Sequence, residues 1–383
     1  MKTLFLLNVT AITPRGLQPN HTIQIQDGRI TAVLPNENVH ELPADVEIFD
    51  ACGAYAAPGF IDLHIHGYAG HGPENAKADD LLAMSAALAK QGVCAFCPTL
   101  YCGTEEEMAH ILRATVGAFG RETGAKMLGY HLEGPFISPQ KPGVMKPQDI
   151  LAPSVNVLAR LYEAAQGKIC SMTLAPERPG MEPVIAFCRE HRILMQAGHT
   201  NATYEEFLAA TRQGITHATH LFNAMSPFNH RAPGAAGAVL LNPQISCEII
   251  ADGVHVHPDV VRFLGRIKPP QQIALVTDAL KPTGQEKGPF YANGEEVISD
   301  GGVWKRKADK VIAGSALTML KGVQNLVRFG FTLAQAAACA AAVPARLLGL
   351  NTRGQVAPGM RADLTLFDKD FHLKAVFING ERK

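Results

Sequence analysis

The beginning of the chain alternates short apolar runs with turn residues, and no helical spacing of apolar positions occurs before Ala78. Thr22–Gln26 and Ile30–Leu34 are short runs rich in apolar and β-branched residues, and Asp27-Gly28 stands between them. An Asp-Gly pair between two such runs is typical of a β-hairpin, because its tight turn requires positive φ angles. The beginning of the chain is therefore expected to form strands.

The same strand-like pattern returns near the end of the chain, in Gly354–Phe367, after an alanine-rich helical segment at Phe331–Leu348. Both ends of the chain therefore resemble each other more than either resembles the middle. They predict a small β-sandwich domain of residues 1–55 and 350–383, with residues 56–349 inserted between them as a second domain.

The middle of the chain alternates strand-like runs with amphipathic helical stretches. Eight strand-like segments occur, near residues 59–65, 93–99, 126–132, 170–175, 193–198, 216–221, 246–251 and 272–277. Helical patterns lie between most of them, at 79–91, 104–119, 154–166, 181–191, 203–213 and 258–265. Thr104 and Thr203 begin capping boxes, and Thr332 is a further expected N-cap. The repeat predicts an α/β protein with a (β/α)8 TIM-like barrel, and a doubly wound parallel sheet is the alternative.

Composition narrows the class of protein. The chain has 383 residues, of which 47% are hydrophobic and 18% charged, and its formal net charge is zero. Without a basic excess, neither nucleic acid nor an acidic membrane surface is an expected partner. No apolar run reaches the roughly 18 residues of a membrane span, and Met1–Asn8 is too short for a signal peptide. A cytoplasmic location is expected.

The eight cysteines fit that compartment as reduced, buried thiols. The tightest group is Cys94, Cys97 and Cys102. Because Cys94 and Cys97 would face opposite sides of a strand, this group is not expected to bind zinc.

One segment carries a candidate pair of metal ligands. Pro58–Gly67 reads as a buried strand that ends in His64 and His66, and the period of two places both imidazoles on one face. The spacing alone is weak evidence, since His255 and His257 repeat it elsewhere in the chain.

Other polar residues recur at the ends of the predicted barrel strands, which is the face where barrel enzymes have their active sites. Besides the histidine pair, these residues are Glu133, His199, His217, His220, Asp252, His255 and Asp278. Burying so many polar groups without partners would cost several kcal/mol each, by order of magnitude. A shared function at this face explains them better.

Imidazole and carboxylate together suit a divalent metal, and Zn²⁺, Fe²⁺, Co²⁺ and Mn²⁺ all remain open. Glu133, His199 and His220 would hold one ion. His64 and His66, with Glu133 as a bridge, would hold a second. Asp278 remains as a carboxylate next to a reacting water, with the expected role of general base and then acid.

These segments resemble a known family. The runs PGFIDLHIHG, HLEGPF, AGHTNA, THLFNAM, ADGVHVHP, VTDA and PGMRADLTLFD occur in order over nearly the whole chain. They resemble the amidohydrolase superfamily and, within it, the N-acetylglucosamine-6-phosphate deacetylases. The branch of the superfamily that uses a carbamylated lysine on strand 4 fits poorly, because Ser171–Glu177 contains no lysine.

The resemblance implies metal-dependent hydrolysis of an acetamido group, giving D-glucosamine 6-phosphate and acetate. Its metal ligands match Glu133, His199 and His220, with His64 and His66 as a pair that some members lack, and its acid/base matches Asp278. It also implies a homodimer in which an arginine reaches the neighbouring active site. The substrate pocket is then expected to include Asn223, Ala224, Arg231, His255, Met145, Ile312, Ala313 and Gly314.

One position departs from the family pattern. The loop after HLEGPF usually carries a histidine that contacts the acyl carbonyl, and here Met145 stands in that loop. Methionine cannot donate a hydrogen bond, so Lys141, Lys146 or His71 would have to replace it. The alternatives are therefore a deacylase of another N-acyl hexosamine phosphate, an N-acyl amino acid or a cyclic amide, or a metal-binding homologue without activity.

Overall fold

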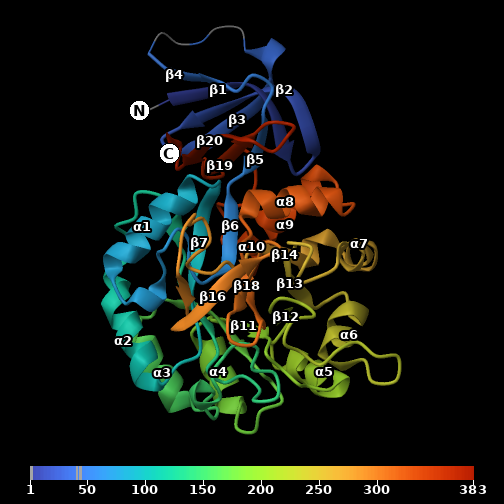
Figure 1. Ribbon diagram of the computed structural model, residues 1–383. Helices are drawn as coiled ribbons and strands as arrows, with labels where there is room; N and C mark the ends of the chain where they lie inside the picture. The colour runs from blue at the N-terminus through green and yellow to red at the C-terminus, as the bar shows by residue number, and fades with distance from the viewer. Residues whose placement is uncertain (1–2, 40–41, 43–44) are drawn as a thin grey trace.

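The computed structural model describes residues 3–39, 42 and 45–383, and it divides into a parallel barrel and a smaller sheet (Figure 1). Both marked chain ends lie beside the smaller sheet. Among the described helices, none is long and apolar enough to cross a membrane.

The smaller sheet is built from both ends of the chain. Its strands are β1 (Thr3–Thr13), β2 (Gly16–Gln26), β3 (Arg29–Pro35), β4 (Glu47–Asp50), β5 (Tyr55–Pro58), β19 (Leu364–Phe367), β20 (Leu373–Ile378) and β21 (Glu381–Arg382). Antiparallel pairing of β5 with β19, in which Pro58 lies opposite Leu364, joins the two ends. The predicted hairpin is confirmed, because β2 pairs antiparallel with β3 up to Gln26 and Arg29.

Eight parallel strands form the predicted barrel. In their order around it they are β6 (Phe60–Ile65), β7 (Val93–Leu100), β9 (Tyr130–Glu133), β10 (Ile169–Leu174), β11 (Leu194–Ala197), β12 (His217–Ala218), β13 (Ser246–Ile250) and β14 (Ile273–Val276). The short β8 (Lys126–Met127) pairs with β7. Residues after β14 close the ring, since the Asp278 amide donates to His64 O at 2.9 Å and the Thr277 hydroxyl to the buried Asp62 at 2.6 Å.

Helices surround the barrel (Figure 1). They are α1 (Ala78–Ala89), α2 (Glu105–Thr115), α3 (Val155–Ala164), α4 (Glu182–Glu190), α5 (Tyr204–Arg212), α6 (Gly234–Leu241), α7 (Pro258–Ile267), α8 (Met319–Arg328), α9 (Leu333–Ala340) and α10 (Ala342–Leu347). Short 3-10 turns are η1 (Asn36–Asn38), η2 (Pro73–Asn75), η3 (Val116–Ala118), η4 (Pro147–Asp149) and η5 (Pro270–Gln272). The capping boxes at Thr104 and Thr203 are confirmed, as is the cap at Thr332. The alanine-rich segment breaks at Ala341, where Pro344 in the first turn of α10 cannot continue the preceding hydrogen-bond ladder.

A four-stranded antiparallel sheet, which the sequence analysis did not anticipate, follows β14. It consists of β15 (Phe290–Ala292), β16 (Glu295–Asp300), β17 (Val303–Arg306) and β18 (Ile312–Ser315). Trp304 anchors it, because the indole N–H donates to the Thr283 hydroxyl at 2.9 Å. β18 brings Ile312, Ala313 and Gly314 to the open end of the barrel.

All eight cysteines are free thiols, as expected, but the expectation that they are buried is wrong for Cys52, which is exposed, and for Cys170, which is half-buried. Cys94 and Cys97 face opposite sides of β7. Cys94 packs against β20, whereas Cys97 lies in the apolar cluster inside the barrel. The groups of described residues that could hold a metal contain none of these thiols.

Candidate metal centre

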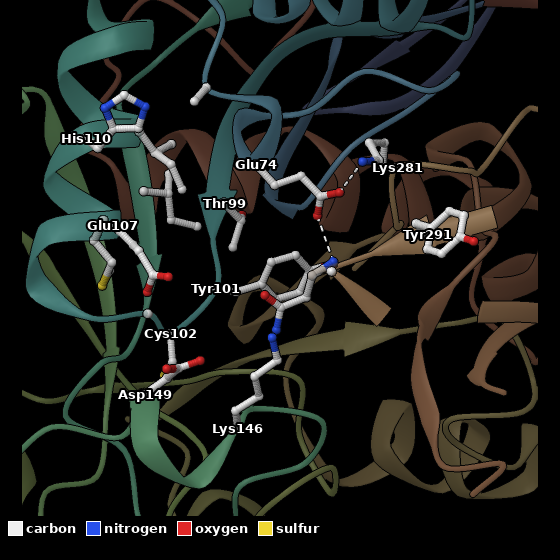
Figure 2. A pocket seen from close by; sticks show the side chains of 17 residues that line it. Glu74, Thr99, Tyr101, Cys102, Glu107, His110, Lys146, Asp149, Lys281 and Tyr291 are labelled. Carbon is white, nitrogen blue, oxygen red and sulfur yellow. Dashed lines mark hydrogen bonds and ion pairs between the residues drawn. The ribbon is translucent and has the colours of Figure 1, made fainter. Parts of the chain in front are cut away.

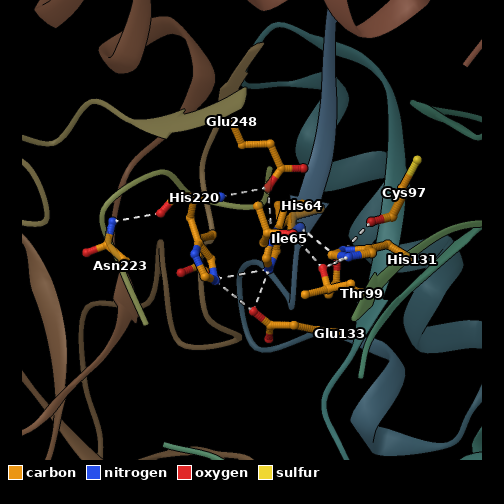
Figure 3. Close-up of polar contacts among 12 residues, drawn as sticks. His64, Ile65, Cys97, Thr99, His131, Glu133, His220, Asn223 and Glu248 are labelled. Atoms are coloured by element: carbon orange, nitrogen blue, oxygen red, sulfur yellow. Dashed lines mark hydrogen bonds and ion pairs between the residues drawn. The ribbon is translucent and has the colours of Figure 1, made fainter. Parts of the chain in front are cut away.

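The predicted ligands converge at the carboxyl ends of the barrel strands, and Figure 3 shows three of them, His64, Glu133 and His220, around one point. They lie in or directly after β6, β9, β11, β12 and β14, and all of them are buried: His64, His66, Glu133, His199, His220 and Asp278. His199, His220 and Asp278 have φ angles of 47°, 25° and 50°. Non-glycine residues seldom adopt this left-handed conformation, and such positions concentrate at functional sites.

Glu133 is the centre of this cluster. Its Oε1 lies 3.2 Å from His199 Nε2 and 3.1 Å from His220 Nε2. Oε1 also lies 3.3 Å from His64 Nε2, and Oε2 lies 3.1 Å from His66 Nε2. The four imidazoles therefore form two groups that share Glu133, and in each group the possible ligand atoms lie within 4.8 Å of one another.

These residues fit a divalent metal. Three of the four imidazole nitrogens, those of His199, His220 and His64, lie within 3.3 Å of Oε1, and a single carboxylate oxygen has only two lone pairs with which to accept hydrogen bonds. His64 Nε2, for example, has no hydrogen-bond partner among the described residues although it is fully buried. A cation accepts lone pairs from all of them at once, and imidazole with carboxylate is a donor set that Zn²⁺ and related ions bind.

Asp278 lies beside the second group. Its Oδ1 is 3.5 Å from His64 Nε2 and 3.4 Å from His66 Nε2. Burial raises the pKa of this carboxyl, but His64 and His66 outweigh burial and hold the pKa below its usual value. Asp278 is therefore ionised at neutral pH, as a proton acceptor must be.

Further buried groups hold the predicted ligands in place, and the sequence did not reveal them. Glu248 is fully buried and its Oε2 accepts a hydrogen bond from His64 Nδ1 at 3.2 Å. This contact fixes the tautomer that leaves Nε2 free for a metal. Glu248 lies in the mostly apolar strand β13. A single carboxylate within such a strand is the feature of the sequence that could have revealed it.

His131 has a different role from its neighbours. It lies between two hydroxyls, with Nδ1 3.2 Å from Thr99 Oγ1 and Nε2 2.8 Å from Thr173 Oγ1 (Figure 3). Burial and the nearby His64 lower its pKa well below the usual value. His131 is therefore a neutral imidazole whose two nitrogens are both occupied.

A cavity of about 150 Å³ opens above the cluster. Seven of the predicted pocket residues line it: Met145, Asn223, Ala224, His255, Ile312, Ala313 and Gly314. His255 Nδ1 lies 2.5 Å from Asp252 Oδ2. Burial lowers the pKa of His255, but Asp252 outweighs burial and raises it, which favours the cationic imidazole. Arg231 is exposed and does not line the cavity of its own chain.

None of the residues suggested as replacements for the donor at Met145 lines this cavity. The side chain of Lys146 lines a neighbouring cavity, and His71 Nδ1 pairs with Asp80 at 2.7 Å. Lys141 contributes its carbonyl oxygen, which accepts from His199 Nδ1 at 2.8 Å. The structure therefore gives no support to these three candidates.

Comparisons with known proteins identify the family of the chain. Residues 55–383 match the model of the amidohydrolase family. An N-acetylglucosamine-6-phosphate deacetylase of Lysinibacillus sphaericus is 30% identical, over 96% of this chain and 94% of its own. An N-acetylgalactosamine-6-phosphate deacetylase of Escherichia coli is 32% identical, over 97% of this chain and 96% of its own.

A solved structure extends the agreement to three dimensions. It is a mutant N-acetyl-D-glucosamine-6-phosphate deacetylase of Mycobacterium smegmatis in complex with N-acetyl-D-glucosamine-6-phosphate, and its TM-score with this chain is 0.89. The two are 30% identical, and the match covers 100% of this chain and 98% of the other. The (β/α)8 barrel, the metal-type cluster at its open end and these similarities lead to one conclusion, that the chain belongs to the amidohydrolase family.

Proposed function

We propose that this protein hydrolyses the acetamido group of N-acetyl-D-glucosamine 6-phosphate to D-glucosamine 6-phosphate and acetate. The observation that carries the proposal is the buried cluster of four imidazoles around Glu133, with Asp278 beside it, at the base of a cavity that also holds His255. The names of the relatives support the same reaction.

Glu133, His199 and His220 would hold one divalent ion, and His64 and His66 with Glu133 would hold a second. Such an ion, when bound, polarises a carbonyl and makes a water more acidic. The nearness of Asp278 Oδ1 to both members of the histidine pair suits it to accept a proton from the attacking water. The same carboxyl would then donate that proton to the departing amine. Zinc is our proposed ion, because it suits mixed imidazole and carboxylate ligands.

The phosphate would lie at the side of the cavity formed by Asn223, Ala224 and His255. A cationic His255 held by Asp252 attracts a dianion. We propose that Arg231 of a second copy completes this end, in a homodimer. Three exposed apolar side chains on α6, on α7 and in the Arg231 loop support such an interface, namely Leu241 at 58%, Phe263 at 51% and Phe228 at 51% exposure.

The decisive experiment is acetate release by protein of measured metal content. The substrates are N-acetylglucosamine 6-phosphate, N-acetylgalactosamine 6-phosphate, N-acetylmannosamine 6-phosphate and the corresponding unphosphorylated sugars. We expect the first substrate to give the highest kcat/KM and the unphosphorylated sugars to be poor. Equal rates on the phosphorylated and the unphosphorylated sugars would contradict the proposal. A higher rate on N-acetylgalactosamine 6-phosphate would identify that sugar as the substrate instead.

The free cysteines support a cytoplasmic location.

A further inference from the structure

An amide carbonyl in this cavity needs a hydrogen-bond donor as well as a metal, because negative charge develops on its oxygen during the reaction. Few lining side chains can supply one. Met145 has no donor, and the Asn223 amide nitrogen already donates to two backbone carbonyls, at 3.1 and 3.3 Å. Among the described residues that line the cavity, Tyr101 carries the single hydroxyl.

Tyr101 is held rigidly against the metal-type cluster. It follows the last residue of β7, and its ring stacks on the His66 imidazole with centroids 3.7 Å apart and planes 6° from parallel. The residue is 8% exposed and belongs to an apolar cluster that includes Met145. A side chain fixed in this way can present its hydroxyl without a further loss of rotamer freedom.

The hydroxyl of Tyr101 has no hydrogen-bond partner among the described residues, although the atom is buried. Tyr101 lines both the active-site cavity and a larger neighbouring cavity of about 480 Å³, whose lining Figure 2 shows. In the larger cavity the Glu74 carboxylate already has partners of its own, because it forms an ion pair with Lys281 and accepts a hydrogen bond from the backbone amide of Asn293 at 2.9 Å. A buried hydroxyl without a partner is uncommon in proteins and calls for an explanation.

The order of the barrel strands places Tyr101 at the acyl end of the substrate. β7 and β12 are four strands apart in either direction around the ring of eight, so they stand opposite each other. Asn223 and Ala224 follow β12 and mark the phosphate end, whereas Tyr101 follows β7. A substrate that extends from the phosphate end across the metal-type cluster directs its acyl group toward Tyr101 and Met145.

We propose that the Tyr101 hydroxyl donates a hydrogen bond to the carbonyl oxygen of the acyl group and stabilises that oxygen in the transition state. The inference rests on the proposed deacetylase function. It identifies a donor in this chain that compensates for Met145.

The test compares the wild-type protein with Tyr101→Phe, which keeps the ring and its stacking and removes only the hydroxyl. Tyr291→Phe is the matched control, because Tyr291 is half-exposed and lines only the neighbouring cavity. We expect kcat of Tyr101→Phe on N-acetylglucosamine 6-phosphate to fall on the order of 10²-fold. KM, metal content and the unfolding temperature should stay close to wild type, since the lost hydroxyl had no protein partner.

An N-trifluoroacetyl substrate sharpens the result, because its carbonyl is already activated and should depend less on Tyr101. A kcat of Tyr101→Phe equal to wild type on the acetyl substrate would overturn the inference. So would a loss of activity that is matched by a loss of metal, since the stacking on His66 would then be responsible. No acetate release by metal-replete wild-type protein would contradict the proposed function itself, which is a distinguishable outcome.

Discussion

Glu248 Oε2 accepts a hydrogen bond from His64 Nδ1 at 3.2 Å, and the same oxygen accepts from the backbone amide of His220 at 3.3 Å. One buried carboxylate atom therefore contacts a member of each group that surrounds Glu133. Contacts of this kind hold a ligand imidazole in one tautomer and orientation. The two predicted metal positions are thus coupled beneath the cluster as well as through Glu133.

We expect Glu248→Gln to weaken metal binding by about 10- to 100-fold. The amide can accept from His64 Nδ1, but it removes the negative charge that makes the imidazole a stronger ligand. Metal content after dialysis against a graded chelator series measures the effect. Glu205→Gln on the outer surface of α5 is a suitable control. Retention of metal equal to wild type would exclude this role for Glu248.

Replacement of Asp278, the proposed acid/base, should separate the chemical step from metal and substrate binding. We expect Asp278→Asn to lower kcat by about 10²- to 10⁴-fold, because an amide neither accepts the proton of the attacking water nor returns it. The proposed ligands Glu133, His199 and His220 are unchanged in this variant, so the ion that they would hold should remain. Turnover near the wild-type value, with metal content confirmed by mass spectrometry, would remove Asp278 from the mechanism.

The barrel and the candidate ligands were predictable because each strand is a short apolar run that ends at a polar residue. Parallel strands bring those ends together, so the position of Glu133 relative to His199 and His220 follows from the repeat. The sheet of β15–β18 was not predictable, because its strands are half-exposed and its residues, such as Glu295 and Glu296, show little apolar alternation.

Residues beneath or beside the ligands were also missed. Glu248 and His131 lie inside buried strands, where sequence shows the polarity of a residue but not its partner. In the sequence, nothing distinguishes Tyr101 from any other aromatic residue that follows an apolar strand. Its stacking on His66 and its unpartnered hydroxyl are properties of the assembled barrel.

Buried His217 predicts a dependence of stability on pH. Burial lowers its pKa to about 4, whereas the unfolded chain has a value near 6.5. The unfolded state therefore binds more protons between these values, and stability falls as pH decreases from about 6.5 to 4. The full effect is on the order of 3 kcal/mol.

We expect His217→Gln to flatten this part of the stability curve, because its side chain does not titrate. Urea unfolding at several pH values between 4 and 7 provides the measurement. The control is His110→Gln, since His110 is exposed on α2. If both variants kept the wild-type pH dependence of the unfolding free energy, the interpretation would be wrong. The difference between the two variants separates the contribution of His217 from that of the other histidines.

The position of Arg231 predicts that two copies of the chain contribute to each active site. It is exposed and does not line the cavity of its own chain, so a contribution to phosphate binding requires a second copy. We expect Arg231→Ala to raise KM for the phosphorylated substrate at least tenfold, about 1.4 kcal/mol, with a smaller effect on kcat. Arg121→Ala, which changes an exposed arginine on the connection between η3 and β8, should have no effect.

Mixing provides the stricter test of the same prediction. Arg231→Ala and Asp278→Asn, each with lowered activity at low substrate concentration, are combined under conditions that exchange subunits. A mixed dimer contains one site with both an intact Asp278 and an intact Arg231 from the neighbour, so activity at low substrate should rise above that of either variant. If Arg231 acted within its own chain, the mixture would contain no repaired site, and its activity would equal the average of the two separate proteins.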